Sequence, residues 1–460
     1  MAIIAIFARK GKSGPPLDCG KSKALIMLDC GASRIETIKI PIGAMNMPNR
    51  RDFAKLVLAG SAGMLAPRGL WPAAAEAPAP PQNADDKFDL LIEGGTVIDP
   101  SQNLNGAFDI AVKNGKILEI SKNISKDRAV KTWSARDRIV TPGFIDMHAH
   151  CYDGVSIGMN ADRYCLGRGV TTMLDAGSAG SATFPNFRKY IINTSTTRIV
   201  ALVHISPIGT IMFDGGLANL SWLNPQATAK MAIDNRPVTV GIKIQLTKAI
   251  SGANDLEALK RALEAAEIAR LPLMVHIEDP YSPLPDILKP LRKGDVFTHC
   301  YTNHTHGILD ANGTIIPEAR EARERGVIFD PAQGQSHFSF DVAEKCMQQG
   351  FLCETISTDL TIVTVERRVF DLPTMVSKFM AIGVPLDKAI AMVTVNPTRV
   401  FDFGAQIGTL RPGSEADISV FELRDGKFEF EDSEGMKRTG QKMLASKAVV
   451  RRGQLFINAV

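Results

Sequence analysis

The chain has 460 residues, of which 45% are hydrophobic and 22% charged, and its formal net charge is +4. This composition allows a large buried core, and the length suits one barrel domain with an accessory domain. The small net charge does not argue for nucleic-acid binding, and no stretch approaches the roughly 18 apolar residues of a membrane span. We therefore expect no nucleic acid among the partners and no stable membrane insertion.

An export signal is expected near the N-terminus. Arg50 and Arg51 precede the apolar stretch 56–65, and the small residues of 73–77 offer a cleavage site. This order is typical of a twin-arginine (Tat) signal, whereas a basic surface helix is the alternative. We expect residues 45–77 to be the signal peptide, the Tat machinery to be a partner and the mature protein to be periplasmic.

The segments on either side of this signal carry less information. An export signal normally begins close to the initiating methionine, so we expect residues 1–44 to be an over-long extension and Met45 or Met47 to be the start. Residues 78–86 are rich in alanine and proline, as expected of a linker.

Short strands are expected at both ends of the mature chain. Residues 88–98, 108–112 and 116–120 alternate with turn residues, and 416–422 and 443–451 have the same pattern. These strands fall in the segments 87–140 and 405–460.

Between these two terminal segments, over residues 141–404, strands and helices alternate eight times. The 255–269 segment, for example, has apolar residues at helical spacing. Such alternation predicts a parallel α/β barrel. The expected strands are 144–150, 170–176, 198–205, 238–245, 272–278, 295–300, 327–330 and 354–359.

Potential metal ligands stand at the ends of these strands. His148 and His150 are separated by one residue, so in a strand both point the same way and can bind one ion. Further ligands end other strands, where they would converge on the barrel mouth: Lys243, His276, His299 and Asp359. The pattern indicates a metallohydrolase site.

The motifs resemble the amidohydrolase superfamily, and within it a dihydroorotase-like amidohydrolase/deacetylase branch, over roughly residues 86–460. The resemblance implies a distorted (β/α)8 TIM barrel, with a small β-sandwich formed by both ends of the mature chain. The matching motifs are TPGFIDMHAH (141–150), GVTTMLDAG (169–177), VGIK (240–243), THC (298–300), ISTD (356–359) and GTLRPGSEAD (408–417).

The resemblance also implies a binuclear centre. Two divalent ions, expected to be Zn²⁺, would be held by His148, His150 and Asp359 on one side and by His276 and His299 on the other. Lys243 would bridge them after reaction with carbon dioxide, as an N6-carboxylysine, because an ammonium group cannot bind a metal but a carbamate can. A structural lysine paired with an acid is the alternative.

In this scheme the two ions share a hydroxide that attacks an amide or ester carbonyl. Asp359 is then the catalytic residue, which takes the proton from the hydroxide and delivers it to the leaving group.

Four further histidines are candidate substrate contacts. His204 ends the third strand and could instead fill the barrel, while His304 and His306 lie in a polar loop. His337 follows Ala332-Gln-Gly334, where relatives in this branch have Gly-His-Gly. Since these loops line the mouth of the barrel, the metal chemistry of the family can be inferred for this chain more safely than its substrate.

We expect hydrolysis of a small acyl amide or ester, as the deacetylase branch suggests. Ring opening of a cyclic amide, as in dihydroorotases and hydantoinases, is the second hypothesis. A non-catalytic binding protein is the third, but all the expected ligands are present in this sequence. Self-association into a homo-oligomer stays open.

Overall fold

The computed structural model describes residues 26–27, 37–38, 87–367 and 369–458. The chain divides into two units, Met1–Glu76 and Ala77–Val460. In the first unit, β1 (Ile26–Met27) pairs antiparallel with β2 (Thr37–Ile38). The expected export signal and the linker lie outside the described residues.

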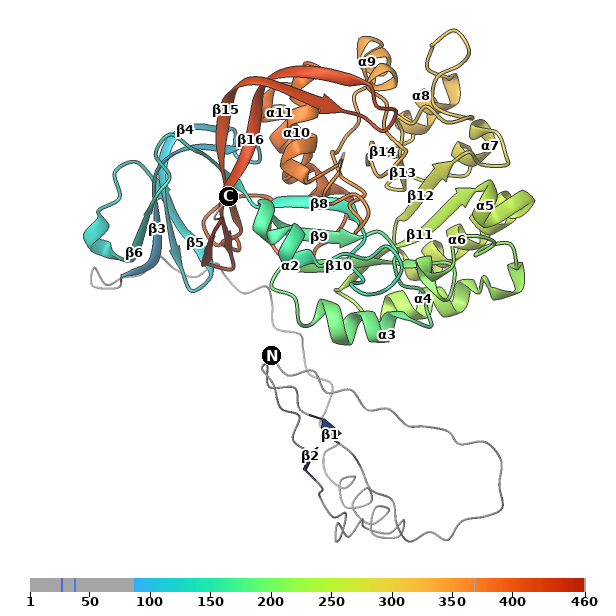
Figure 1. The fold of residues 1–460 in the computed structure, drawn as a ribbon, viewed down its shortest axis with the longest axis horizontal. Helices are drawn as coiled ribbons and strands as arrows, with labels where there is room; N and C mark the ends of the chain where they lie inside the picture. The colour runs from blue at the N-terminus through green and yellow to red at the C-terminus, as the bar shows by residue number, and fades with distance from the viewer. Residues whose placement is uncertain (1–25, 28–36, 39–86, 368, 459–460) are drawn as a thin grey trace, which may run out of the picture. The chain divides into compact units, whose positions relative to one another are not determined.

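Seven parallel strands form a curled sheet in this unit (Figure 1). Every residue of the first, second and fourth strands is buried, as expected where helices cover the outer face and side chains fill the interior. The strands begin and end within two residues of the expected ranges. They are β8 (Phe144–Ala149), β9 (Val170–Asp175), β10 (Arg198–His204), β11 (Thr239–Thr247), β12 (Leu273–Glu278), β13 (Val296–Thr298) and β14 (Ile328–Asp330).

The eighth expected strand, 354–359, is not a strand in the structure, so that prediction was wrong. Asp359 has a φ of 50°, which an extended ladder does not accept. Its backbone N–H still donates to the carbonyl of His148 at 2.6 Å, and Leu360 forms an isolated parallel bridge with Ala149. On the other side, the Gly334 N–H donates to the Thr358 carbonyl. An irregular segment between β14 and β8 thus completes a TIM-barrel-like fold.

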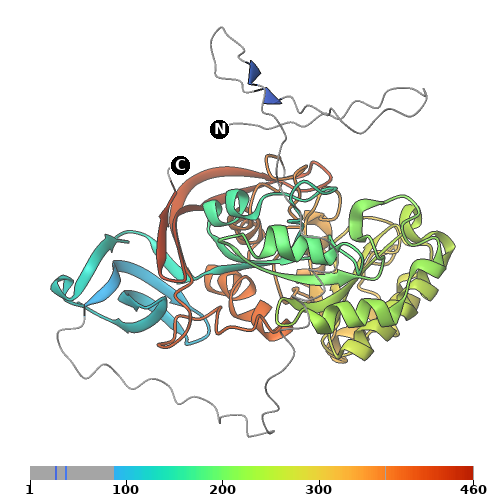
Figure 2. The same cartoon turned by 90° about the horizontal axis from the view of Figure 1, so that it is seen from below.

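Helices alternate with the strands and cover the sheet (Figures 1 and 2). The expected helix at 255–269 is present as α6, which buries an alanine-rich face. Within the described part of the chain, no helix is both long and apolar enough to cross a bilayer. The helices are α2 (Ala161–Tyr164), α3 (Phe184–Phe187), α4 (Pro225–Asp234), α5 (Lys248–Ser251), α6 (Asp255–Ala269), α7 (Leu284–Leu288), α8 (Pro317–Glu324), α9 (Phe340–Gln348), α10 (Leu372–Ala381), α11 (Leu386–Met392) and α12 (Val395–Val400).

Strands from both ends of this unit join in a second sheet, in the order β17-β16-β15-β7-β3-β4-β5, with β6 paired to β3. Both ends were expected to contribute, but β6, β7 and β17 were missed. The strands are β3 (Phe88–Asp99), β4 (Leu104–Lys113), β5 (Lys116–Ser121), β6 (Ala129–Ser134), β7 (Ile139–Pro142), β15 (Ile418–Glu431), β16 (Lys437–Arg451) and β17 (Gln454–Ile457).

Gly143 connects this sheet to the barrel, between β7 and β8. A Cβ at this position would lie 2.1 Å from Thr171 Oγ1 in β9, so the close approach of the two strands requires glycine.

The β15–β16 hairpin is longer than expected and reaches across the barrel (Figure 1). Its strand β16 packs on α10, where the Leu444 N–H donates to Ser377 Oγ at 3.0 Å. Near its tip, Asp432 accepts a hydrogen bond from the first N–H of α9, that of Phe340, at 2.9 Å. The C-terminal part of the chain therefore contributes to the rim of the barrel.

Candidate active site

Two groups of buried side chains meet at the carboxyl end of the barrel strands. The first group is His148, His150 and Asp359, and the second is His276, His299 and His337. Within each group the potential ligand atoms lie within 4.8 Å of one another. Five of these six residues were predicted as ligands from the sequence, and His337 was predicted as a substrate contact.

The first group is organised around one carboxylate oxygen. Asp359 Oδ1 lies 3.5 Å from His148 Nε2 and 3.3 Å from His150 Nε2. The other ring nitrogens are held from behind, His148 Nδ1 by the hydroxyl of Thr298 at 2.9 Å and His150 Nδ1 by that of Ser178 at 2.8 Å. Such outer contacts fix the ring orientation of metal-binding histidines, and here they leave both Nε2 atoms facing Asp359.

Buried carboxylates support these hydroxyls in turn. Thr298 donates to Asp330 Oδ2 at 2.9 Å, and Ser178 donates to Asp175 Oδ2 at 2.7 Å. Burial raises the pKa of Asp330, although hydrogen bonds from hydroxyl groups partly oppose that shift. These residues were not predicted from the sequence, although Asp330 ends a predicted strand and Asp175 is the next-to-last residue of another, which was the available signal.

The second group brings three imidazoles together. His276 Nδ1 lies 2.9 Å from His299 Nε2, while His299 Nδ1 contacts the carbonyl of Ala332 at 2.7 Å. The ring of His337 lies 4.1 Å from that of His299, measured between centroids. His299 has a φ of 65°, and such strained backbone is common at functional sites.

The chemistry of these residues fits a divalent cation. Burial lowers the pKa of His148, His276 and His299 well below the usual histidine value, with nearby cationic groups acting in the same direction. Neutral imidazoles offer a lone pair to a metal. In addition, His276 Nε2 and His337 Nδ1 are buried without a hydrogen-bond partner among the described residues.

Lys243 lies in the middle of β11 and is fully buried between the two groups and the barrel interior. Its Nζ is 3.3 Å from His148 Nε2 and 3.4 Å from Met274 Sδ, and no ion pair of the described residues includes it. Burial lowers its pKa to about 7, although Asp359 and other acids oppose the shift. Gly177 allows this position, because a Cβ there would lie 2.6 Å from Lys243 Cβ.

Both groups open into one cavity of about 450 Å³, here called the metal-cluster cavity. Glu278 on its wall lies 3.3 Å from His337 Nε2, and that hydrogen bond is the main cause that lowers the pKa of Glu278 to about 2. The lining residues are His150, Ile157, Phe213, Gln245, Ile250, His276, Glu278, Gln335, Ser336, His337, Asp359, Thr361 and Val363.

The other histidines that were predicted as substrate contacts lie in different surroundings. His304 is half-buried, with Nδ1 3.5 Å from Asp279 Oδ2 and Nε2 3.6 Å from Glu278 Oε1. His306 is exposed, and His204 is buried beside Lys243, where its Nδ1 accepts the N–H of Ser206. Of the four, only His337 lines the metal-cluster cavity in the described part of the chain.

Comparison with known proteins agrees with this geometry. The model of the amidohydrolase family matches residues 139–449, which include both groups and Lys243. The chain belongs to the amidohydrolase family. The resemblance inferred from the sequence motifs is thereby confirmed, and the barrel and its histidine-rich mouth are those of an amidohydrolase.

Two deacetylases are among the relatives of this amidohydrolase. That of Brucella anthropi is 32% identical over 64% of this chain and 74% of its own length. That of Enterococcus faecalis is 32% identical over 69% of this chain and 87% of its own length.

Solved structures extend the likeness to the fold. An adenine deaminase is 31% identical with a TM-score of 0.76, covering 81% of this chain and 100% of that one. A dihydroorotase is 28% identical with a TM-score of 0.73, covering 80% and 98%.

Proposed function

We propose that this amidohydrolase is a metal-dependent hydrolase that cleaves a small acyl amide or ester. The observation that carries this proposal is the pair of adjoining groups, one with two imidazoles and a carboxylate and one with three imidazoles. Both groups contribute side chains to the wall of a single cavity. The two deacetylase relatives favour an acyl substrate.

The proposed centre holds two divalent ions, and we propose zinc for both. His148, His150 and Asp359, which form the first group, would hold one ion. His276 and His299, which belong to the second group, would hold the other. Tetrahedral sites of nitrogen and oxygen ligands suit zinc.

We propose Lys243 as the bridge, carboxylated by carbon dioxide. A buried ammonium without an ion-pair partner is costly, whereas a carbamate has one negative charge and two oxygens to share between two cations. Its contact with His148 Nε2 puts the side chain beside the first group.

When bound, the ions would activate water as a nucleophile and polarise the carbonyl of the substrate. The remaining chemistry belongs to the chain. Asp359 accepts the proton of the attacking water and delivers it to the leaving nitrogen or oxygen. The glycine at position 334 leaves space for the carboxylate of Asp359, since a Cβ at this position would lie 2.3 Å from Asp359 Oδ2.

The cavity volume supports a compact substrate. About 450 Å³ is within the range of small-molecule sites and too small for a folded partner. Apolar side chains of Ile157, Phe213 and Ile250 line the wall together with the amide of Gln245, which suits an acyl group beside a polar bond.

A substrate panel tests the proposal. Zinc-loaded enzyme is assayed with acetylated amino acids, acetylated hydroxy acids, dihydroorotate, a hydantoin and adenine. We expect turnover of acetylated compounds. Efficient turnover of the cyclic amides alone would replace the proposal by ring opening, and turnover of adenine alone would replace it by deamination.

The metal assignment makes a separate prediction. Purified wild-type enzyme should contain close to two divalent ions per chain, and Lys243→Ala should contain one or fewer, because the variant lacks the shared ligand. Elemental analysis after gel filtration measures both. Lys248→Ala, which removes an exposed lysine just beyond the same strand, is the control and should keep two. Two ions and full activity in Lys243→Ala would remove this residue from the site.

We further propose that the two ends of the mature chain form a β-sandwich beside the barrel, and that residues 45–77 direct export to the periplasm. The shared sheet supports the first proposal, and the arginine pair supports the second.

A further inference from the structure

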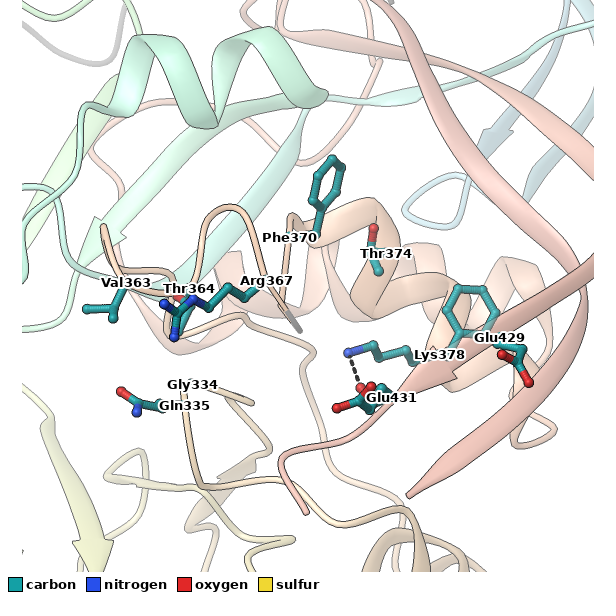
Figure 3. Close-up of a pocket in the computed structure, with 11 residues that line it drawn as sticks. Gly334, Gln335, Val363, Thr364, Arg367, Phe370, Thr374, Lys378, Glu429 and Glu431 are labelled. Carbon is teal, nitrogen blue, oxygen red and sulfur yellow. Dashed lines mark hydrogen bonds between the residues drawn. The ribbon is translucent and has the colours of Figure 1, made fainter. Parts of the chain in front are cut away.

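A second cavity adjoins the metal-cluster cavity. Figure 3 shows the side chains that line it. Its volume is about 700 Å³, and we call it the side chamber. Gln335 and Val363 line both cavities, so the two spaces meet at these residues. The side chamber therefore lies next to the metal-cluster cavity, on the other side of Gln335 and Val363.

The walls of the side chamber come from three distant parts of the chain. The loop after β14 supplies Gly334 and Gln335, and the tip of the β15–β16 hairpin supplies residues 429–431. The loop after Asp359 supplies Val363, Thr364, Arg367 and Phe370. Apolar groups of Val363, Phe370 and Phe430 alternate with polar ones. This composition suits an organic group that also has a polar end.

Arg367 and Lys378 are the basic side chains that line the chamber in the described part of the chain. Figure 3 shows Arg367 extending toward the side of the pocket that holds Val363 and Gln335. Its guanidinium makes no hydrogen bond or ion pair with any residue in the described ranges 87–367 and 369–458.

The other charged groups on the walls have partners. Lys378 donates to Gln333 Oε1 at 2.6 Å and to the Glu431 carbonyl at 2.8 Å, the second bond being drawn in Figure 3. Glu429 lies 3.2 Å from Lys437 Nζ. The walls also carry the carboxylates of Glu429 and Glu431, but Arg367 lies on the other side of the chamber, near Val363 and Gln335. Arg367 is therefore the cation that a ligand reaching past Gln335 would meet.

The loop that carries Arg367 is held in place. Arg168 donates to the carbonyls of Val365 and Phe370, and its guanidinium lies 4.3 Å from the centre of the Phe370 ring. Thr364 Oγ1 accepts the N–H of Thr361. A charged group on an anchored loop loses less conformational freedom when it binds a ligand.

We propose that the side chamber receives the part of the substrate remote from the scissile bond, and that Arg367 binds a carboxylate there. This inference rests on the proposed acyl hydrolysis and narrows its substrate class to acylated carboxylic acids with an apolar body. Arginine suits this role because its planar fork matches the two oxygens of a carboxylate.

Paired substrates test the charge preference. N-acetylphenylalanine and O-acetylphenyllactate are each compared with the corresponding carboxamide, using zinc-loaded wild-type, Arg367→Met and Arg367→Lys enzymes. For the carboxylates, Arg367→Met should lower kcat/KM by about 10-fold or more, mostly through KM, because the contact is present in both ground and transition states. Arg367→Lys should lie between the two. The carboxamides should change little.

Arg399→Met is the matched control, because Arg399 is exposed on α12 and lines neither cavity. Equal losses for carboxylates and carboxamides, or no loss at all, would overturn the proposal.

A binding measurement separates this inference from the proposed function. Phenylpropanoate has no acyl bond to cleave, and its dissociation constant is measured by calorimetry. We expect it to rise about 10-fold in Arg367→Met and to stay unchanged in Arg399→Met. If no acyl compound is hydrolysed but this difference is found, the proposed function fails and the carboxylate site stands. Equal affinities, or no binding to the wild type, refute the carboxylate site whatever the activity.

Discussion

Asp359 combines two roles in the proposed site, since it lies between both histidines of the first group and also faces the cavity. Asp359→Asn should fold and keep at least one metal ion while kcat falls by about 100-fold or more, because an amide can bind a metal but cannot accept the proton. Single-turnover assays and metal analysis measure both effects. Asp214→Asn, an exposed change in the loop after β10, is the control. Near-normal turnover would contradict the role as general base.

His204 should make the metal-free protein sensitive to acid. Burial lowers its pKa from 6.5 to about 3. Below pH 6.5 the unfolded chain therefore binds a proton that the folded chain does not, so the free energy of unfolding rises with pH between about 3 and 6.5. At pH 4.5 this residue should cost about 2 to 3 kcal/mol relative to neutral pH.

Urea unfolding of the metal-free wild type and of His204→Asn, at pH 7 and pH 4.5, isolates this effect. The difference in unfolding free energy between the two pH values should be smaller in the variant by about that amount. His306→Asn changes an exposed histidine and should behave as the wild type does. Identical pH dependence in all three proteins would show that His204 takes up its proton in the folded state.

At the scale of elements, the β15–β16 hairpin is the feature that shapes the rim. Arg438 near its tip contacts Glu344 of α9 through Nε at 2.9 Å and Nη2 at 2.8 Å, and Asp341 at 2.6 Å. Arg438→Ala should speed amide hydrogen exchange in residues 428–440 while changing global stability by only about 1 kcal/mol or less, because the pairs are partly exposed. Lys442→Ala removes an ion pair within the hairpin and is the control. Unchanged exchange at the tip would mean that Arg438 does not hold it.

The sequence predicted the regular elements of the barrel well, because each strand is an apolar run between turn residues and each ligand ends such a run. His148 and His150 followed from the alternation of strand side chains alone. The prediction of a strand at 354–359 was wrong. Hydroxyl groups of this segment donate hydrogen bonds to Asp330 and Asp146, and the segment does not form a regular strand ladder. The periodicity of apolar residues does not predict such hydrogen bonds.

Loop residues were the least predictable part of the site. His337 joins the second group and Arg367 enters the side chamber through loops whose course depends on contacts with distant residues, such as the Lys378 bond to Gln333. Sequence spacing does not encode such contacts. The supporting acids Asp175 and Asp330 were within reach, because they occupy strand ends as the ligands do.

At the scale of the whole molecule, the proposed export can be tested in cells. Arg50→Lys combined with Arg51→Lys should leave the protein in the cytoplasm, because the Tat machinery recognises the arginine pair. Cell fractionation with immunoblotting measures the distribution, and Arg68→Lys, outside that pair, is the control. Processed protein in the periplasm of the double variant would refute a twin-arginine signal.

The seam between β8 and the segment ending at Leu360 also bears on how the protein is made. Asp146 and Thr358 meet across it through a 2.6 Å hydrogen bond, although they are 212 residues apart in the chain. A fold with contacts of such separation is expected to form slowly, because a long loop of chain must close before the contact is made. During synthesis, His148 and His150 leave the ribosome long before Asp359 does, so the first group of candidate ligands is complete only when the barrel has closed. Binding of the full set of metal ions would then indicate a completely folded barrel. A chain truncated before Asp359 should purify without its full complement of metal, even if its first strands fold.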